Sequence, residues 1–244
     1  MRFAAIADIH GNSDALAAVL ADIAALDIDD VVNLGDHLSG PLEPVRTADM
    51  LMARSFPSVR GDQDRHMIDL HRAGDLSRRD VRALRQEHVA WLAAQPATLL
   101  YRDEVFMCHA APDDDAAFWL EDILADGTPR PNALASIETR AAGIDASLIL
   151  CGHSHIPRLI RLGDGRLIVN PGSVGLPGYR LATPKRYHVE AGTPDACYAI
   201  AERRLEQWSV TFRYVPYDPA AMAALARQGG RPDWANAIAT GWVA

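Results

Sequence analysis

The sequence predicts an α/β fold of the mixed (α+β) type, in which two mixed β-sheets lie between layers of helices. Apolar strand patterns alternate with amphipathic helical patterns in the first part of the chain, and hairpin patterns dominate later. The 244 residues fit one large domain, since single hydrophobic cores stop growing at about 250–300 residues. Strands joined both by helices and by hairpins indicate mixed sheets covered by helices.

The first quarter of the chain repeats one unit, in which an apolar strand ends in a turn and an amphipathic helix follows. Ser13 is the expected N-cap of the first helix, because its hydroxyl can accept a hydrogen bond from a free backbone amide of the first turn. Leucine, valine and isoleucine then recur at helical spacing. The pattern predicts strands at residues 2–7, 31–34 and 57–60, and helices at residues 13–26 and 43–54.

The rest of the chain adds hairpins and helical segments. Helical spacing near residues 64–95 and 112–142 predicts two helical insertions within the single domain 1–244. The second insertion is expected to hold helices at 118–124 and 133–142, because a stretch rich in proline and glycine separates these segments. The remaining patterns predict strands at 99–101, 105–108, 147–151, 158–161, 167–169, 197–200 and 209–214, and a last helix at 219–227.

Charge and composition exclude several classes of partner. Lysine and arginine number 24 against 32 acidic residues, so the net charge of −8 provides no broad basic surface for nucleic acid or an anionic membrane. No window approaches the ~20 apolar residues of a membrane span, and the N-terminus lacks a signal-peptide pattern. The three cysteines are too few and too scattered for a disulfide framework. We therefore expect a cytoplasmic protein.

Acidic and imidazole side chains follow the predicted strands. Ligands bind at the carboxyl ends of strands in open α/β sheets, so these side chains are expected to meet at one edge. They are too many for one ion but suit two ions that share a carboxylate. A single aspartate after a strand is often a helix cap and a single histidine is often structural, so the prediction depends on the joint pattern. The candidate ligands are Asp8, His10, Asp36, Asp62, His109, His153 and His155.

In order along the chain, these motifs resemble the calcineurin-like metallophosphoesterase superfamily, and in particular its small bacterial phosphodiesterase-like branch. The resemblance implies a four-layer αββα sandwich with a dinuclear metal centre at one edge of its two sheets. The residues that carry it are Asp8-Ile9-His10, Gly35-Asp36, Gly61-Asp62-Gln63-Asp64, His109, Gly152-His153-Ser154-His155 and Asn170-Pro171-Gly172-Ser173-Val174-Gly175.

The resemblance also implies a role for each ligand. A hydroxide shared by the two ions would attack phosphorus in line, so no side-chain nucleophile is needed. Mixed imidazole and carboxylate ligands accept Mn, Fe, Zn or Ni, so the metal is not determined by the ligand set. In this scheme one ion would be held by Asp8, His10 and His155, the other by Asp62, His109 and His153, and Asp36 would bridge them.

The third motif departs from the family pattern, which normally reads Gly-Asn-His-Asp. Asp62 can still bind metal, but it adds a third carboxylate to the site, and we expect the less positive centre to hold phosphate more weakly. Gln63 can donate a hydrogen bond but cannot transfer a proton. His37 and His66 are weak candidates for contact with the leaving group or the phosphate; the alternative is that they are exposed loop or helix residues. Asp64 is expected to cap the next helix or to support a ligand.

The leading hypothesis is therefore a metal-dependent phosphoesterase that acts on a small phosphate ester, phosphodiester or nucleotide anhydride. Good leaving groups should be favoured, because the loss of a positioned general acid costs on the order of 10²–10⁴ in rate and matters least when the leaving group needs no proton. The alternative is a catalytically weakened or non-catalytic binding module that retains the fold. The Asp62-Gln63 change favours the module, whereas the presence of all the candidate ligands favours the enzyme.

Overall fold

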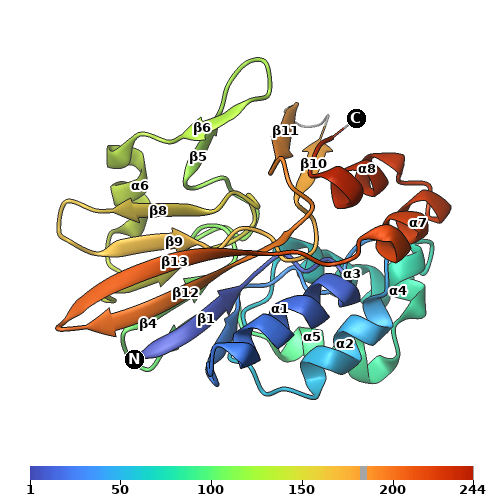
Figure 1. The fold of residues 1–244 in the computed structure, drawn as a ribbon, viewed down its shortest axis with the longest axis horizontal. Coiled ribbons are helices and arrows are strands. Elements are labelled where there is room, and N and C mark those ends of the chain that lie inside the picture. Colours follow the sequence, from blue (N-terminus) through green and yellow to red (C-terminus); the bar gives the residue numbers. More distant parts are fainter. Residues whose placement is uncertain (182–185, 244) are drawn as a thin grey trace.

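Two β-sheets form the centre of the molecule in the computed structural model, which describes residues 1–181 and 186–243 (Figure 1). The first sheet has the order β13-β12-β1-β2, with β1 and β2 parallel and the other pairs antiparallel. Its strands are β1 (Arg2–Ile6), β2 (Val31–Asn33), β12 (Ala196–Arg204) and β13 (Gln207–Val215).

The second sheet has the order β3-β4-β7-β9-β8, in which β4, β7 and β9 are parallel and the two edge strands are antiparallel to their neighbours. Both sheets are mixed, as predicted. The strands of this sheet are β3 (Thr98–Tyr101), β4 (Val105–Cys108), β7 (Leu148–Leu150), β8 (Arg158–Arg161) and β9 (Leu167–Asn170).

The two sheets pack face to face through apolar side chains. Phe3 and Ala5 of β1 share one buried cluster with Met107 of β4 and Leu150 of β7. Ile6 points to the opposite face of the strand and belongs to a different cluster, between the first sheet and the helix Ser13–Ala25. Because β1 is covered on both faces, its sequence is an unbroken apolar run rather than an alternating one.

Helices cover the outer face of each sheet (Figure 1). Leu16 and Val19 of α1 pack on the first sheet, and Ile137 and Ala141 of α6 pack on the second. The predicted four-layer fold class is confirmed. The helices are α1 (Ser13–Ala25), α2 (Pro44–Met52), α3 (Asp62–Arg72), α4 (Arg79–Ala83), α5 (Gln86–Ala94), α6 (Leu134–Ala141), α7 (Ala220–Gln228) and α8 (Pro232–Thr240).

Two predicted elements are wrong. The helix expected at 118–124 is instead an irregular segment that ends in the strand β5 (Glu121–Ile123), paired with β6 (Pro129–Pro131). Glu121 is buried there and accepts a hydrogen bond from Arg158 at 2.7 Å, so a tertiary contact overrides the local helical pattern. The strand expected at 57–60 forms only an isolated bridge between Ser58 and Asn33, in line with the preceding proline, which has no N–H to continue a ladder.

Three elements near the C-terminus were not predicted. They are the two strands of a hairpin, β10 (Gly178–Leu181) and β11 (Tyr187–Glu190), and the helix α8. The helix predicted at 219–227 is confirmed as α7, but α8 follows it, so it is not the last helix. In Figure 1 this hairpin lies beside α8. All three cysteines carry free, buried thiols. Within the described ranges, no helix combines the length and apolar character needed to cross a lipid bilayer.

Candidate metal centre

The candidate ligands come from turns that follow the strands of both sheets. Asp8 and His10 follow β1, Asp36 follows β2, and His153 follows β7. These four residues and His155 have φ between 50° and 69°, in the left-handed region. Such a backbone costs a residue other than glycine of order 1–3 kcal/mol and persists only where the surrounding structure holds it. Left-handed strain in five residues that share one site indicates a functional constraint.

Hydrogen bonds between the turns hold this backbone in place. The amide of Asp8 donates to the carbonyl of Gly35 at 3.0 Å, and the amide of His10 donates to the carbonyl of Asp36 at 2.9 Å. The amide of His153 donates to the Asp8 carboxylate at 3.0 Å, which joins the first sheet to the second. The position of each ligand therefore depends on the turns beside it.

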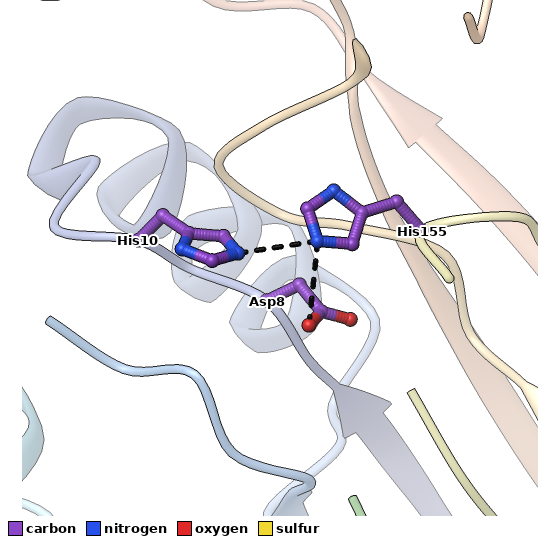
Figure 2. Close-up of side chains that lie close together, drawn as sticks. All are labelled: Asp8, His10 and His155. Atoms are coloured by element: carbon purple, nitrogen blue, oxygen red, sulfur yellow. Dashed lines mark hydrogen bonds and ion pairs between the residues drawn. The ribbon is translucent and has the colours of Figure 1, made fainter. Parts of the chain in front are cut away.

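Asp8, His10 and His155 form a first cluster (Figure 2). The two Nε2 atoms of the imidazoles lie 3.1 Å apart, and that of His155 lies 3.5 Å from the Asp8 carboxylate. The Nδ1 atom of His155 donates to the carbonyl of Leu176 at 2.7 Å, so its Nε2 lone pair faces the cluster. The Nδ1 atom of His10 lies 2.9 Å from the hydroxyl of Ser39. Nitrogen lone pairs and a carboxylate that face one point suit a divalent cation.

Burial sets the protonation of this cluster. It lowers the pKa of His10 to about 4, although the charge of Asp62 acts in the opposite direction. Burial and the nearby His10 hold the pKa of His155 well below its usual value. Both imidazoles are therefore neutral at neutral pH, which is the form that binds metal. Burial raises the pKa of Asp8 to about 6, against the opposing influence of His109 and His153.

Asp62, His109 and His153 form a second cluster. One oxygen of Asp62 lies 3.3 Å from Nε2 of His109 and 3.2 Å from Nδ1 of His153. The Nδ1 atom of His109 donates to the carbonyl of Leu34 at 2.7 Å, so this ring is oriented in the same manner as His155. The three side chains offer one carboxylate and two imidazole nitrogens, which repeats the composition of the first cluster.

Asp36 lies between the two clusters. One of its oxygens is 3.6 Å from Nε2 of His10 and the other is 3.5 Å from Nε2 of His109. One carboxylate thus faces both sets of ligands, which is the arrangement that a bridging ligand requires. Burial and the nearby charge of Asp62 raise the pKa of Asp36 well above its usual value. The structure therefore brings all seven predicted ligands together.

Several ligand atoms are buried without a hydrogen-bond partner among the described residues: Oδ1 of Asp8, Oδ1 of Asp62 and Nε2 of His109. Buried polar atoms are almost always paired in proteins, because an unpaired one costs about 1–3 kcal/mol. Divalent cations would satisfy these atoms. The side chains present thus fit the metal ions that the sequence predicts.

The three further candidates lie in different surroundings. The amide of Gln63 donates to Asp62 at 2.7 Å, beside the ligands. His66 is exposed on α3. His37 is fully buried, with Nδ1 2.6 Å from Asp64 and its ring packed against Trp91, so the expectation of an exposed loop residue is wrong. Neither His37 nor His66 lines the cavity at the ligands.

Asp64 supports the ligands, as predicted. Its carboxylate accepts hydrogen bonds from the backbone amides of Asp36 at 2.9 Å, His37 at 3.0 Å and Gly61 at 2.9 Å. Burial disfavours the charge on Asp64, yet His37 and these amides hold its pKa below the usual value. A carboxylate that is ionised in this position fixes the turn that carries Asp36 to the turn that begins α3.

The sequence profile of the calcineurin-like phosphoesterase superfamily domain matches residues 1–190. The chain belongs to this superfamily. A metallophosphoesterase from Sphaerobacter thermophilus, solved by crystallography, is 25% identical over 99% of this chain and 100% of its own, with a TM-score of 0.74. A hypothetical protein from Pyrococcus horikoshii OT3 is 20% identical over 100% of this chain and 99% of its own, with a TM-score of 0.73. No curated protein sequence matches the chain.

A cavity of about 410 Å³ opens beside the ligands of this calcineurin-like phosphoesterase. The hydroxyl of Tyr179 donates to the carbonyl of His153 at 3.1 Å, and its ring lies 4.5 Å from that of His155. The ring of Trp234 lies 5.5 Å from that of His10. Sequence reasoning missed this side of the site because it missed the elements that carry it. The residues of this wall are Tyr179, Arg180, Tyr187, Arg231 and Trp234.

Two local signals pointed to these elements. Pro232 occupies the first turn of α8. Proline is favoured at this position because a backbone N–H there would have no acceptor within the helix. Along β11, the apolar residues Tyr187 and Val189 alternate with the polar residues His188 and Glu190, as in a strand with one face covered. Both segments are short, however, and neither contains one of the motifs that carry the predicted metal ligands.

Proposed function

We propose that this protein is a phosphoesterase that uses two divalent metal ions to hydrolyse small phosphodiesters or nucleotide anhydrides. The observation that carries the proposal is the convergence of three carboxylates and four imidazoles in two clusters, with Asp36 between them. Membership of a phosphoesterase superfamily supports the same reaction class.

The side chains would act chiefly by holding and orienting. Two divalent ions in these clusters would supply the positive field that makes water acidic and stabilises charge on the phosphate oxygens. The backbone carbonyls of Leu34 and Leu176 keep the rings of His109 and His155 in the tautomer that presents Nε2 to an ion. Asp64 keeps the turn of Asp36 in position.

The substrate preference follows from the residues next to Asp62. Gln63 uses its side-chain amide to donate to Asp62, and an amide has no proton to give to a leaving group. His37, which could supply one, is buried against Asp64 and Trp91. We therefore expect esters and anhydrides whose leaving groups are stable as anions to react faster than alkyl monoesters.

The test compares hydrolysis of bis(p-nitrophenyl) phosphate and p-nitrophenyl phosphate by the protein loaded with Mn²⁺. We expect the diester to react faster, and the double variant Asp62→Asn with Gln63→His to gain about tenfold or more on the monoester, because it restores a group that can transfer a proton. The exposed residue His66 provides the control His66→Ala, which should behave as the wild type.

The outcome that would contradict the proposal is specific. If the wild-type protein hydrolyses neither ester, nor a nucleotide anhydride, with Mn²⁺, Fe²⁺, Zn²⁺ or Ni²⁺, it is not a phosphoesterase. Inactivity of the double variant under the same conditions would leave the binding module as the function of this fold.

A further inference from the structure

The cavity beside the metal ligands contains two arginines that lack acidic partners. Arg79 begins α4 and Arg180 lies in β10; both are exposed, and neither forms an ion pair within residues 1–181 and 186–243. The other arginines of the cavity differ. Arg78 pairs with Asp80 at 2.5 Å, and Arg231 pairs with its own aspartate, Asp233, at 2.7 Å.

The metal centre cannot account for this positive charge. Three carboxylates, from Asp8, Asp36 and Asp62, would offset most of the charge of two divalent ions, and the hydroxide that the ions share would offset the remainder. The centre therefore has no net charge left with which to attract a second anionic group of the substrate. The guanidinium groups of Arg79 and Arg180 add two positive charges to the same cavity, in a protein whose net charge is −8.

We propose that the substrate carries, besides the phosphate that is cleaved, a second phosphate group that Arg79 and Arg180 bind. A terminal phosphate bears a charge of about −1.5 to −2 at neutral pH, which matches two guanidinium groups. The planar fork of arginine fits phosphate oxygens in a bidentate manner. This inference rests on the proposed function, because it names a second recognition site for the same substrate.

The shape of the site leaves room for such a substrate. The volume of about 410 Å³ lies within the range of roughly 300–1,000 Å³ typical of small-molecule sites. Gly40, Pro41, Arg79 and Asp80 also border a second cavity of about 670 Å³, over α2 and α4. Arg79 thus lies where the two cavities meet, and the substrate can extend past it.

The test uses two chromogenic substrates that differ by one phosphate: thymidine 5′-(p-nitrophenyl phosphate) and its 3′-phosphorylated form. Both release the same leaving group. We expect the Mn²⁺-loaded wild-type protein to have a kcat/KM about tenfold or more higher for the 3′-phosphorylated substrate. Hydrogen bonds between the arginines and the charged phosphate should contribute measurably to the binding energy, even near solvent. The variants Arg79→Ala and Arg180→Ala should each lose part of this preference, and the double variant should lose all of it.

A matched control is available on α3. Arg72 is exposed and lies outside the cavity, at the opposite end of the helix that begins with Asp62. The variant Arg72→Ala should keep the wild-type preference. Calorimetry gives a second readout that needs no turnover: thymidine 3′,5′-bisphosphate should bind more tightly than thymidine 5′-monophosphate to the wild type, and equally to the variant that lacks both Arg79 and Arg180.

The outcomes separate this inference from the proposed function. No hydrolysis of either aryl ester or of a nucleotide anhydride with any of the four metals would contradict the enzyme, whereas calorimetry would still report on the arginines. Hydrolysis of that ester with equal kcat/KM for the two thymidine substrates would overturn only the second phosphate site. If Arg79→Ala and Arg180→Ala slow both thymidine substrates by the same factor, the arginines contact the cleaved phosphate, and the inference is wrong.

Discussion

Gly61→Ala should displace the carboxylate that lies between the two ligand clusters. A Cβ atom at residue 61 would lie 2.6 Å from the backbone nitrogen of Asp36 and 2.9 Å from its Cγ, and closer still to its Oδ1. The two backbone segments cannot separate freely, because the amides of Gly61 and Asp36 both donate to the same oxygen of Asp64, each at 2.9 Å. The methyl group therefore has to move Asp36.

The size of the effect follows from these distances. An ordinary carbon–nitrogen contact needs a separation larger by about 0.8 Å, whereas metal–ligand distances hold to within about 0.2 Å. We expect the affinity for Mn²⁺ to fall by about tenfold to a hundredfold or more, as for the loss of a group that orients a ligand. The strain should cost about 1–3 kcal/mol of stability, typical of an overpacked core. This lowers the Tm by about 2–12 °C for a protein of this size.

Calorimetric titration of the metal-free protein with Mn²⁺ measures the affinity, and thermal unfolding without metal measures the stability. The control is Gly163→Ala, where the added Cβ would meet only a side-chain oxygen of Glu138 at 3.1 Å, so both quantities should stay near the wild-type values. If Gly61→Ala binds Mn²⁺ as tightly as the wild type, Asp36 is not a metal ligand and the assignment of the site is wrong.

Three other predictions concern stability and pH. Asp22 accepts hydrogen bonds from Arg213 at 2.7 Å and from Tyr198 at 2.6 Å, and the bond from Arg213 lowers the pKa of Asp22. Urea unfolding should therefore show that Asp22→Asn lowers the free energy of unfolding by about 1 kcal/mol at pH 7. This difference should fade as the pH falls below about 4, where the wild-type carboxylate becomes protonated. Burial raises the pKa of Asp8 to about 6, and a metal ion binds only the ionised carboxylate. Calorimetry should therefore show that the affinity for Mn²⁺ falls by about tenfold per pH unit below pH 6. Constant affinity from pH 7 to pH 5 would refute this prediction. Asp64→Asn should lower the free energy of unfolding in urea by about 3 kcal/mol and weaken Mn²⁺ binding, because it removes a buried charged acceptor; unchanged unfolding would contradict the supporting role of Asp64.

Much of the fold was predictable because the local sequence pattern identifies its central strands. The apolar runs of β1, β4 and β7 are long enough to identify, and a residue that follows such a strand lies at the edge of the sheet in any α/β arrangement. The grouping of the seven ligands followed from this rule together with the motif order. Ile6 and Leu150, for example, are buried where the pattern placed them.

The rest depended on contacts between distant segments. Local spacing gave no sign that Glu121 would be buried beside Arg158, 37 residues away, and the helix predicted there is a strand instead. His37 was expected to be an exposed loop residue, but the side chain of Asp64, 27 residues later in the next motif, contacts it and the ring is buried. A buried polar pair of this kind is set by the tertiary fold, which local propensity does not encode.

The third carboxylate, from Asp62, and the arginines Arg79 and Arg180, which form no ion pair among the described residues, belong to one electrostatic arrangement. In the proposed reaction, a third carboxylate would weaken the binding of the cleaved phosphate at the metal centre. Arg79 and Arg180 lie in the same cavity and can bind a group of the substrate that is remote from the reacting phosphate. The binding energy from this contact can position the reacting phosphate without making it bind more tightly to the ions before the reaction. The variant Asp62→Asn should therefore reduce the dependence of kcat/KM on the second phosphate, since the metal centre would then bind the cleaved phosphate more strongly.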